Sequence, residues 1–323
     1  MSRLRSIVHG ARWWAWTIAH NANGRAEERS NSASNGGDPT DSPWHEAIVR
    51  YYDLTHHHYH LVWSDWQTQA LHYGIDDEQT RNHTQRLQRT NEVLAAALEL
   101  KPGMRVLDAG CGTGGSACWL AEQFGVHVTG LTISPRQAKL ARENADRRGL
   151  ADSVRFVCGN YDRLDASEGS FDRVWALESF VHGPDKRATL TEMARVLKPG
   201  GRLVIADGMR GDERHRLDTW LLERIERGWT LPGIAAVQDY RRWLAETGFE
   251  DIAVVDHSAA IGRSARRLAL TCAAVLPGMT IGHRIGLIHD VERANVLGTI
   301  AAWAALRRGA WTYHVVTARR AIS

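Results

Sequence analysis

VLDAGCGTGG, residues 106–115, is the stretch of this chain that says most about its fold. A short apolar run reaches Asp108, and Gly110, Gly112 and Gly115 then fit the G-x-G-x-x-G spacing that joins a strand to a helix around a ligand. Glycine lets the backbone approach such a ligand closely. We therefore expect a cofactor loop at the carboxyl end of a parallel sheet.

The sequence on both sides alternates between helix-like and strand-like segments. The helix-like segments are 116–124, 134–149, 188–197 and 239–249, and the strand-like segments are 104–110, 127–133, 154–160, 171–177, 202–208, 252–257 and 312–320. Such alternation is typical of strands joined by crossover helices. It predicts an α/β fold: a Rossmann-like, seven-stranded, mostly parallel sheet with helices on both faces.

Further helical segments are expected to form a cap over this core, since long insertions in such sheets often build a lid or a substrate wall. The expected parts of one domain over residues 44–323 are cap helices at 44–100, the core at 101–257, a helical lid insertion at 258–311 and the last strand at 312–323. Residues 1–43 are first basic and Trp-rich, then rich in Asn, Ser, Gly and Asp. They predict an amphipathic or disordered leader and linker.

Composition excludes several classes of protein. The net charge is +3 with 24% charged residues, which is too even for a dedicated nucleic-acid-binding chain. The four cysteines form no CxxC pair, which argues against a disulfide framework or structural zinc and suits a reducing, cytoplasmic compartment. No apolar run reaches the roughly 18 residues of a membrane span. We expect a small-molecule partner, no nucleic acid and no stable membrane insertion, with homo-oligomerisation left open.

Two cofactor classes fit the glycine loop. A dinucleotide would place its pyrophosphate at the helix N-terminus, where Asp108 would repel it. The acid that binds ribose about 20 residues further on is also missing, because the second strand ends in Gly130-Leu131-Thr132. A cationic sulfonium with an amino acid moiety would instead suit Asp108, which leaves a dinucleotide oxidoreductase as the weaker alternative.

With GLTISPRQ (130–137), FDRVWALESFVHGPDK (171–186) and RVLKPGGRLVIAD (195–207), the glycine loop resembles class I S-adenosylmethionine-dependent methyltransferases. More narrowly, the chain is similar to the tocopherol and rifamycin O-methyltransferases and to isoprenoid C-methyltransferases. The resemblance implies S-adenosyl-L-methionine as cofactor. It implies cofactor contacts at Asp108, Gly110, Gly112, Gly114, Thr132, Ile133, Gln137, Asn160 and Tyr161. Asn160 departs from the family, which usually has Asp there.

The resemblance also implies two catalytic residues. Glu178 follows the fourth strand, beside the expected methyl group, and His182 four residues later is a candidate general base. The alternative for both is a structural role in shaping this loop. Val181 stands where relatives often carry a second Glu, which argues against a cyclopropane-synthase mechanism.

Substrate contacts are expected at His58 and His60 in the cap and at Trp229 and Tyr240 before the sixth strand. The histidine cluster lacks zinc-site spacing, so no metal is expected. The predicted function is O-methylation of a bulky apolar small molecule, an isoprenoid or polyketide secondary metabolite. C-methylation of an isoprenoid alkene, with Mg²⁺ on a diphosphate, and an inactive S-adenosylmethionine-binding module remain alternatives.

Overall fold

The computed structural model describes residues 43–58 and 69–322, with the side chains of 56–58 left out. The helices, including one 3-10 turn, are α2 (Pro43–His58), α3 (His83–Leu98), α4 (Gly115–Phe124), α5 (Pro135–Arg147), η2 (Phe180–His182), α6 (Lys186–Val196), α7 (Arg216–Trp229), α8 (Val237–Glu246), α9 (Gly262–Arg284) and α10 (Asp290–Arg308). The strands are β1 (Arg105–Ala109), β2 (His127–Thr132), β3 (Val154–Cys158), β4 (Phe171–Leu177), β5 (Leu197–Arg210), β6 (Phe249–Asp256) and β7 (Trp311–Arg320).

The strands form one seven-stranded sheet in the order β3-β2-β1-β4-β5-β7-β6. Strands β3, β2, β1, β4 and β5 pair in parallel, and β7 runs antiparallel to both of its neighbours. The predicted Rossmann-like, mostly parallel sheet is confirmed. The strand order reverses between β1 and β4, which is where sheets of this type hold their ligands.

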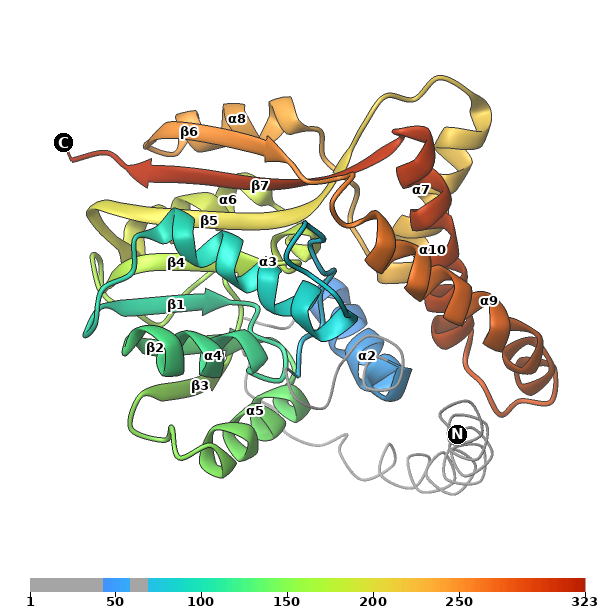
Figure 1. Cartoon of the computed structure of the whole chain (residues 1–323), viewed down its shortest axis with the longest axis horizontal. Coiled ribbons are helices and arrows are strands. Elements are labelled where there is room, and N and C mark those ends of the chain that lie inside the picture. The colour runs from blue at the N-terminus through green and yellow to red at the C-terminus, as the bar shows by residue number, and fades with distance from the viewer. Residues whose placement is uncertain (1–42, 59–68, 323) are drawn as a thin grey trace.

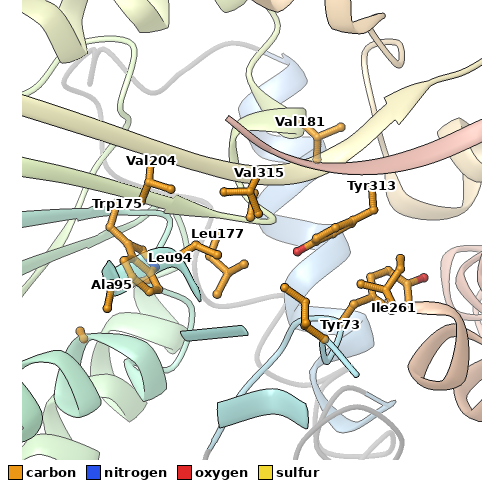
Figure 2. Close-up of a cluster of buried hydrophobic side chains, with 14 of the residues drawn as sticks. Tyr73, Leu94, Ala95, Trp175, Leu177, Val181, Val204, Ile261, Tyr313 and Val315 are labelled. Atoms are coloured by element: carbon orange, nitrogen blue, oxygen red, sulfur yellow. The ribbon is translucent and has the colours of Figure 1, made fainter. Parts of the chain in front are cut away.

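The sheet buries apolar side chains on both faces because successive residues of a strand point in opposite directions. Val106, Trp175 and Val204 pack with α3, α4 and α5 on one face, and the residues next to them pack with α6 and α8 on the other. Figure 2 shows Trp175 beside Leu94 and Ala95 of α3. This two-sided burial accounts for the nearly continuous apolar runs in the sequence of the central strands.

Helices α2, α7, α9 and α10 lie beyond the carboxyl ends of the parallel strands (Figure 1). Helices α7 and α10 approach each other closely at Gly228 and Gly298, where a Cβ on Gly228 would lie 2.7 Å from the Gly298 Cα. The expected helices in 258–311 are thus α9 and α10. Both are joined to the sheet edge, since they connect β6 to β7.

The segment before α3 is not helical, although cap helices were expected over residues 44–100. Its described part, residues 69–82, is irregular. Its backbone N–H groups are bound by other elements: Gly74 N donates to Ser264 Oγ at 3.0 Å and Ile75 N to Thr90 Oγ1 at 2.9 Å. A helix would use those donors internally, so the tertiary contacts override the helical pattern.

Helix α7 was also not expected from the sequence.

Candidate active site

One large cavity lies at the carboxyl ends of the parallel strands, where the strand order reverses. It encloses about 1380 Å³ of empty space, counting its open mouth. Its walls come from the loop after β1, the ends of β2, β4 and β5, the residues around η2, and the irregular segment 69–73. Eleven of the residues predicted from the sequence to bind or act on ligands line it: Asp108, Gly110, Gly112, Thr132, Ile133, Gln137, Asn160, Tyr161, Glu178, His182 and Trp229.

Gly110 allows two loops to meet at the floor of the cavity. Its φ is +99°, and a Cβ there would lie 2.2 Å from the Ser179 Cβ. Ser179 Oγ in turn donates to the Ala109 carbonyl across this contact. Gly112, with φ of +53°, has Leu71 of the irregular segment above it, 3.3 Å from where its Cβ would be. Because Gly110 and Gly112 have no side chains, the segments that carry Ser179 and Leu71 can pack directly against the glycine loop.

Gly114 does not have the role predicted for it. It caps α4 with φ of +81°, does not line the cavity, and a Cβ there would lie 2.5 Å from the Phe156 ring. Its missing side chain makes room for packing of the glycine loop against β3. The prediction of a cofactor contact at Gly114 is therefore corrected. The spacing of the glycines alone cannot tell which of them faces the ligand.

Asp108 lies one residue before the end of β1 with its carboxyl group buried, and its Oδ2 has no hydrogen-bond partner within the described ranges 43–58 and 69–322. Burial raises the pKa of Asp108 to about 7 because a charged carboxylate is poorly solvated there. A buried acceptor without a donor is costly, on the order of 1–3 kcal/mol. A cationic or N–H-bearing ligand in the cavity would relieve that cost.

Thr132 and Gln137 form a polar pair at the end of β2. Thr132 Oγ1 donates to Gln137 Oε1 at 2.7 Å, and both side chains are buried at the cavity wall. Gln137 is held in place by α5, whose N-cap Ser134 accepts from the Gln137 N–H at 3.2 Å. Ile133, between the strand and this cap, supplies an apolar surface to the same wall.

Asn160 and Tyr161 follow β3 and lie on the far side of the cavity from the glycine loop's helix. Asn160 Nδ2 lies 2.8 Å from His45 Nε2 of α2 and 3.3 Å from Asp162 Oδ2. Tyr161 donates its hydroxyl to the Ser179 carbonyl at 2.8 Å. These contacts tie the loop after β3 to the cap and to the loop after β4.

Glu178 leaves β4 in a left-handed conformation, with φ of +50°, and its carboxyl group anchors two aromatic residues. Oε1 accepts from the Tyr73 N–H at 2.7 Å and from the Tyr313 hydroxyl at 2.8 Å. Burial, aided by the nearby Asp207 carboxyl group, raises the pKa of Glu178 to about 8. Figure 2 shows the rings of Tyr73 and Tyr313, whose centroids are 6.0 Å apart.

His182 ends η2 and lies near the rings of Tyr51 and Tyr52, with ring centroids 6.3 and 5.5 Å away. Burial and the charge of Lys186 lower the pKa of His182 to about 4, so the ring is neutral at pH 7. The ring hydrogen-bonds to the backbone of Thr230, and Nδ1 has no partner in the described part of the chain. A neutral imidazole with a free ring nitrogen is a proton acceptor.

The backbone before His182 is clamped by a buried pair of opposite charges. Asp207 Oδ2 accepts from the Val181 N–H at 2.7 Å, and Lys186 Nζ donates to the Val181 carbonyl at 2.8 Å. Burial raises the pKa of Asp207 to about 7 and lowers that of Lys186 to about 8. Both groups therefore fix the peptide that carries His182 into the cavity wall.

His72 is a site residue that sequence reasoning missed. Its side chain is 4% exposed and lines the cavity. Nδ1 donates to the Tyr73 carbonyl at 2.9 Å, and Nε2 has no hydrogen-bond partner among the described residues. Burial lowers the pKa of His72 to about 4. The sequence placed His72 in the histidine cluster, but only the irregular backbone around it decides which way the ring points.

The four residues predicted to contact the substrate do not all line the cavity. Trp229, at the end of α7, lines the cavity with its ring centroid 5.9 Å from that of Trp311. Tyr240 is wrong as a substrate contact, because it is fully buried between Phe180 and Trp243 on the other face of the sheet. The side chain of His58 and the whole of His60 lie outside the described residues.

The cavity wall carries acidic side chains but, within the described residues, no lysine or arginine. Among the described residues that line it, none is a lysine or an arginine, whereas Asp108, Glu178 and Asp207 all contribute carboxyl groups. The described ranges also contain no group of three metal-ligating side chains. Such walls favour a neutral or cationic ligand over a phosphorylated one.

This fold and site define a class I, S-adenosylmethionine-dependent methyltransferase. Residues 106–201 match the family model for a methyltransferase domain. The chain is 39% identical over 210 residues to the methyltransferase GfsG of Streptomyces halstedii, covering 64% of this chain and 74% of that protein. It is 34% identical to the 27-O-demethylrifamycin SV methyltransferase of Amycolatopsis mediterranei over 58% of this chain and 69% of that one. The chain therefore belongs to the S-adenosylmethionine-dependent methyltransferases, in the group that includes such O-methyltransferases.

Among solved structures, the [4+2]-cyclase SpnF superposes with a TM-score of 0.71 at 26% identity, covering 90% of this chain and all of that one. A cyclase on the same fold shows that the fold alone does not set the reaction. The sequence relatives decide it here, because they are methyltransferases. They also leave the dinucleotide oxidoreductase without support. No helix of residues 43–58 or 69–322 is long and apolar enough to cross a membrane.

The residues of the cavity fit S-adenosylmethionine. The unpartnered Oδ2 of Asp108 suits the cationic amino acid end, and the bare backbone at Gly110 and Gly112 leaves space for it. The Thr132–Gln137 pair offers polar atoms for ribose hydroxyls. The absence of basic lining among the described residues spares a sulfonium any repulsion.

Proposed function

We propose that this protein transfers a methyl group to a hydroxyl of a bulky, largely apolar and unphosphorylated small molecule, such as an isoprenoid or polyketide secondary metabolite. The observation that carries the proposal is the cavity wall: apolar and aromatic side chains, the neutral imidazoles of His72 and His182, and no lysine or arginine among the described lining residues. Aromatic walls at Trp229, Trp311 and Tyr313 suit a bulky apolar acceptor. The relative named for 27-O-demethylrifamycin SV supports the acceptor class.

The cofactor supplies an activated methyl group when bound, so the protein's task is to align the acceptor and to receive its proton. We assign proton acceptance to Nδ1 of His182, which is unpartnered, neutral and part of the cavity wall. The Asp207–Val181–Lys186 clamp keeps that ring in position. A positioned imidazole of this kind contributes about 10²–10⁴-fold to a proton transfer.

Glu178 is assigned an orienting role. Its Oε1 is already occupied by Tyr73 and Tyr313, so it fixes the segment and the strand on either side of the acceptor space. Because its pKa is about 8, the carboxyl group is mostly protonated at pH 7 in the free protein. A bound cation lowers the pKa of a nearby carboxyl, which would make Glu178 a counter-charge in the loaded site.

C-methylation of an isoprenoid diphosphate is the second candidate, and the charge of the cavity speaks against it. A diphosphate needs basic side chains or a metal held by acidic ones. The described lining offers neither lysine nor arginine, and the described residues hold no metal-binding group. C-methylation of an uncharged hydroquinone or alkene stays compatible with the same walls.

The test is transfer of a tritiated methyl group from S-adenosylmethionine to a panel of acceptors. The panel holds 27-O-demethylrifamycin SV, 2-methyl-6-phytyl-1,4-hydroquinone, tocopherols and geranyl diphosphate. We expect label in a hydroxylated apolar acceptor, as an alkali-stable ether by mass spectrometry, and none in geranyl diphosphate. Label in geranyl diphosphate, or in carbon only, would overturn the proposal. His182→Ala should lower kcat at least about 100-fold with unchanged cofactor binding.

A further inference from the structure

His72 presents a second free acceptor nitrogen to the cavity, on a segment that is held rigidly. Tyr73, Gly74 and Ile75 each donate a backbone N–H to a side chain of another element, at 2.7, 3.0 and 2.9 Å. The Asp76 N–H donates to the Ala260 carbonyl at 2.9 Å. Four consecutive anchored donors leave this irregular segment little freedom, so the ring of His72 is carried by a fixed backbone.

The tautomer of His72 follows from its one hydrogen bond. The Tyr73 carbonyl can only accept, so Nδ1 carries the proton and Nε2 has the lone pair. That carbonyl also accepts from Thr90 Oγ1 at 2.9 Å, which fixes its direction. Nε2 is buried and has no partner among the residues that the structure describes, and His72 lines the cavity. A buried acceptor in this state calls for a donor from a ligand.

The place of His72 points to the acceptor molecule rather than to the cofactor. Its neighbour Tyr73 binds Glu178 and packs at 5.7 Å from Trp311 and 6.0 Å from Tyr313, which are the aromatic walls of the acceptor space. The cofactor residues Asp108, Thr132 and Gln137 come from other elements, namely β1, β2 and α5, and Thr132 and Gln137 bind each other.

We propose that Nε2 of His72 accepts a hydrogen bond from the methyl acceptor, and that His72 therefore selects molecules with a second hydroxyl besides the one that is methylated. This inference rests on the proposed function, because it assumes an acceptor hydroxyl at His182. With the two imidazoles as acceptors, the site takes a diol or dihydroxyaryl compound with an apolar body. His72 is a specificity-determining residue in this scheme, and the proton of the reaction goes to His182.

The first experiment measures the tautomer directly, with no acceptor present. Nitrogen NMR of the histidine-labelled free protein, with His72 assigned by its loss in His72→Phe, should show a protonated Nδ1 and an unprotonated Nε2. A protonated Nε2 would overturn the proposal, because that nitrogen would then be a donor. This result does not depend on turnover, so it stands apart from the proposed function.

The second experiment measures binding to the protein saturated with S-adenosylhomocysteine. The probes are 2-octyl-1,4-hydroquinone and 4-octylcatechol, each compared by calorimetry with its monomethyl ethers. For whichever of the two diols binds more tightly, we expect the natural protein to bind the diol about tenfold more tightly than its monomethyl ethers. His72→Phe should reduce that preference to less than about twofold, and His72→Gln, which keeps an acceptor oxygen, should restore part of it.

His314→Phe is the matched control. His314 is likewise a buried histidine with an unpartnered Nδ1, but it does not line the cavity. Its replacement should leave the diol preference unchanged. Equal binding of diol and ether to the natural protein, no binding of any probe, an undiminished preference in His72→Phe, or weaker S-adenosylhomocysteine binding in that variant would each overturn the proposal. Failure of methyl transfer with an intact diol preference would count against the proposed function alone.

Discussion

Gly110→Ala should be strongly destabilising, for two reasons that the structure separates. The first is backbone strain, since φ at Gly110 is +99°. An L side chain in such a conformation costs about 1–3 kcal/mol. The second is a collision, because the new Cβ would lie 2.2 Å from the Ser179 Cβ and 2.7 Å from its Oγ. Neither Cβ can rotate away, so the two loops must separate.

The separation carries its own cost. Overpacking of this kind costs about 1–3 kcal/mol. Loss of the hydrogen bond from Ser179 Oγ to the Ala109 carbonyl adds about 1 kcal/mol. Together with the strain, Gly110→Ala should lower the free energy of unfolding by roughly 3–7 kcal/mol, against a typical total of about 5–15 kcal/mol. Tm should fall by on the order of 10 °C.

Gly103→Ala is the matched control, because Gly103 has φ of +80° but nothing within 4 Å of its Cβ position. Urea unfolding followed by circular dichroism gives the free energy for both variants. The difference between them isolates the collision, and Ser179→Gly should recover about 1–3 kcal/mol of it in the double variant. The reasoning is refuted if Gly110→Ala costs no more than Gly103→Ala, or if Ser179→Gly recovers nothing.

Three other predictions concern the buried polar groups. Between pH 6.5 and 8 the folded protein keeps on Glu178 a proton that the unfolded chain, with a pKa of 4.5, has already released, so stability falls as pH rises. His72 and His182 also contribute to the slope near pH 6.5, but both proteins contain them. Glu178→Gln should therefore make the slope of stability against pH less negative by on the order of 1 kcal/mol per pH unit in urea unfolding; parallel slopes in the two proteins would contradict this. Asp108→Asn should weaken binding of S-adenosylmethionine about tenfold or more in calorimetry without lowering Tm, and unchanged affinity would remove Asp108 from the cofactor site. Tyr240→Phe removes a buried hydroxyl without a partner, so Tm should hold or rise and methyl transfer should continue at its usual rate; a large loss of activity would restore Tyr240 to the site.

The glycine loop shows what sequence could predict and why. Asp108, Gly110 and Gly112 face the cavity because a strand, a tight turn and a helix follow one another there with little conformational choice. The nearly continuous apolar runs of β1 and β4 likewise identify central strands that are buried on both faces of a parallel sheet. Local chemistry and topology together placed these residues at the carboxyl edge of the sheet.

The misses have a different physical origin. Tyr240 and Leu244 lie on the buried face of α8, as its pattern indicates, but both sheet faces are buried and only one reaches the cavity. His72 lies in backbone without a period, so no spacing rule gives its direction. Its orientation comes from Ser264, Thr90 and Glu178, which are far away in the sequence.

The clamp on Val181 has a consequence for how this site can change over time. Asp207 and Lys186 hold the peptide of residue 181 by its N–H and its carbonyl, and neither holds the side chain. The side chain that faces the cavity at this position is therefore exchangeable without moving the neighbouring imidazole. A lineage could place valine here, or a carboxylate, and alter the chemistry offered to the acceptor while inheriting an unchanged loop. Position 181 is thus a point where new acceptors can be acquired by a single codon change rather than by rebuilding the wall.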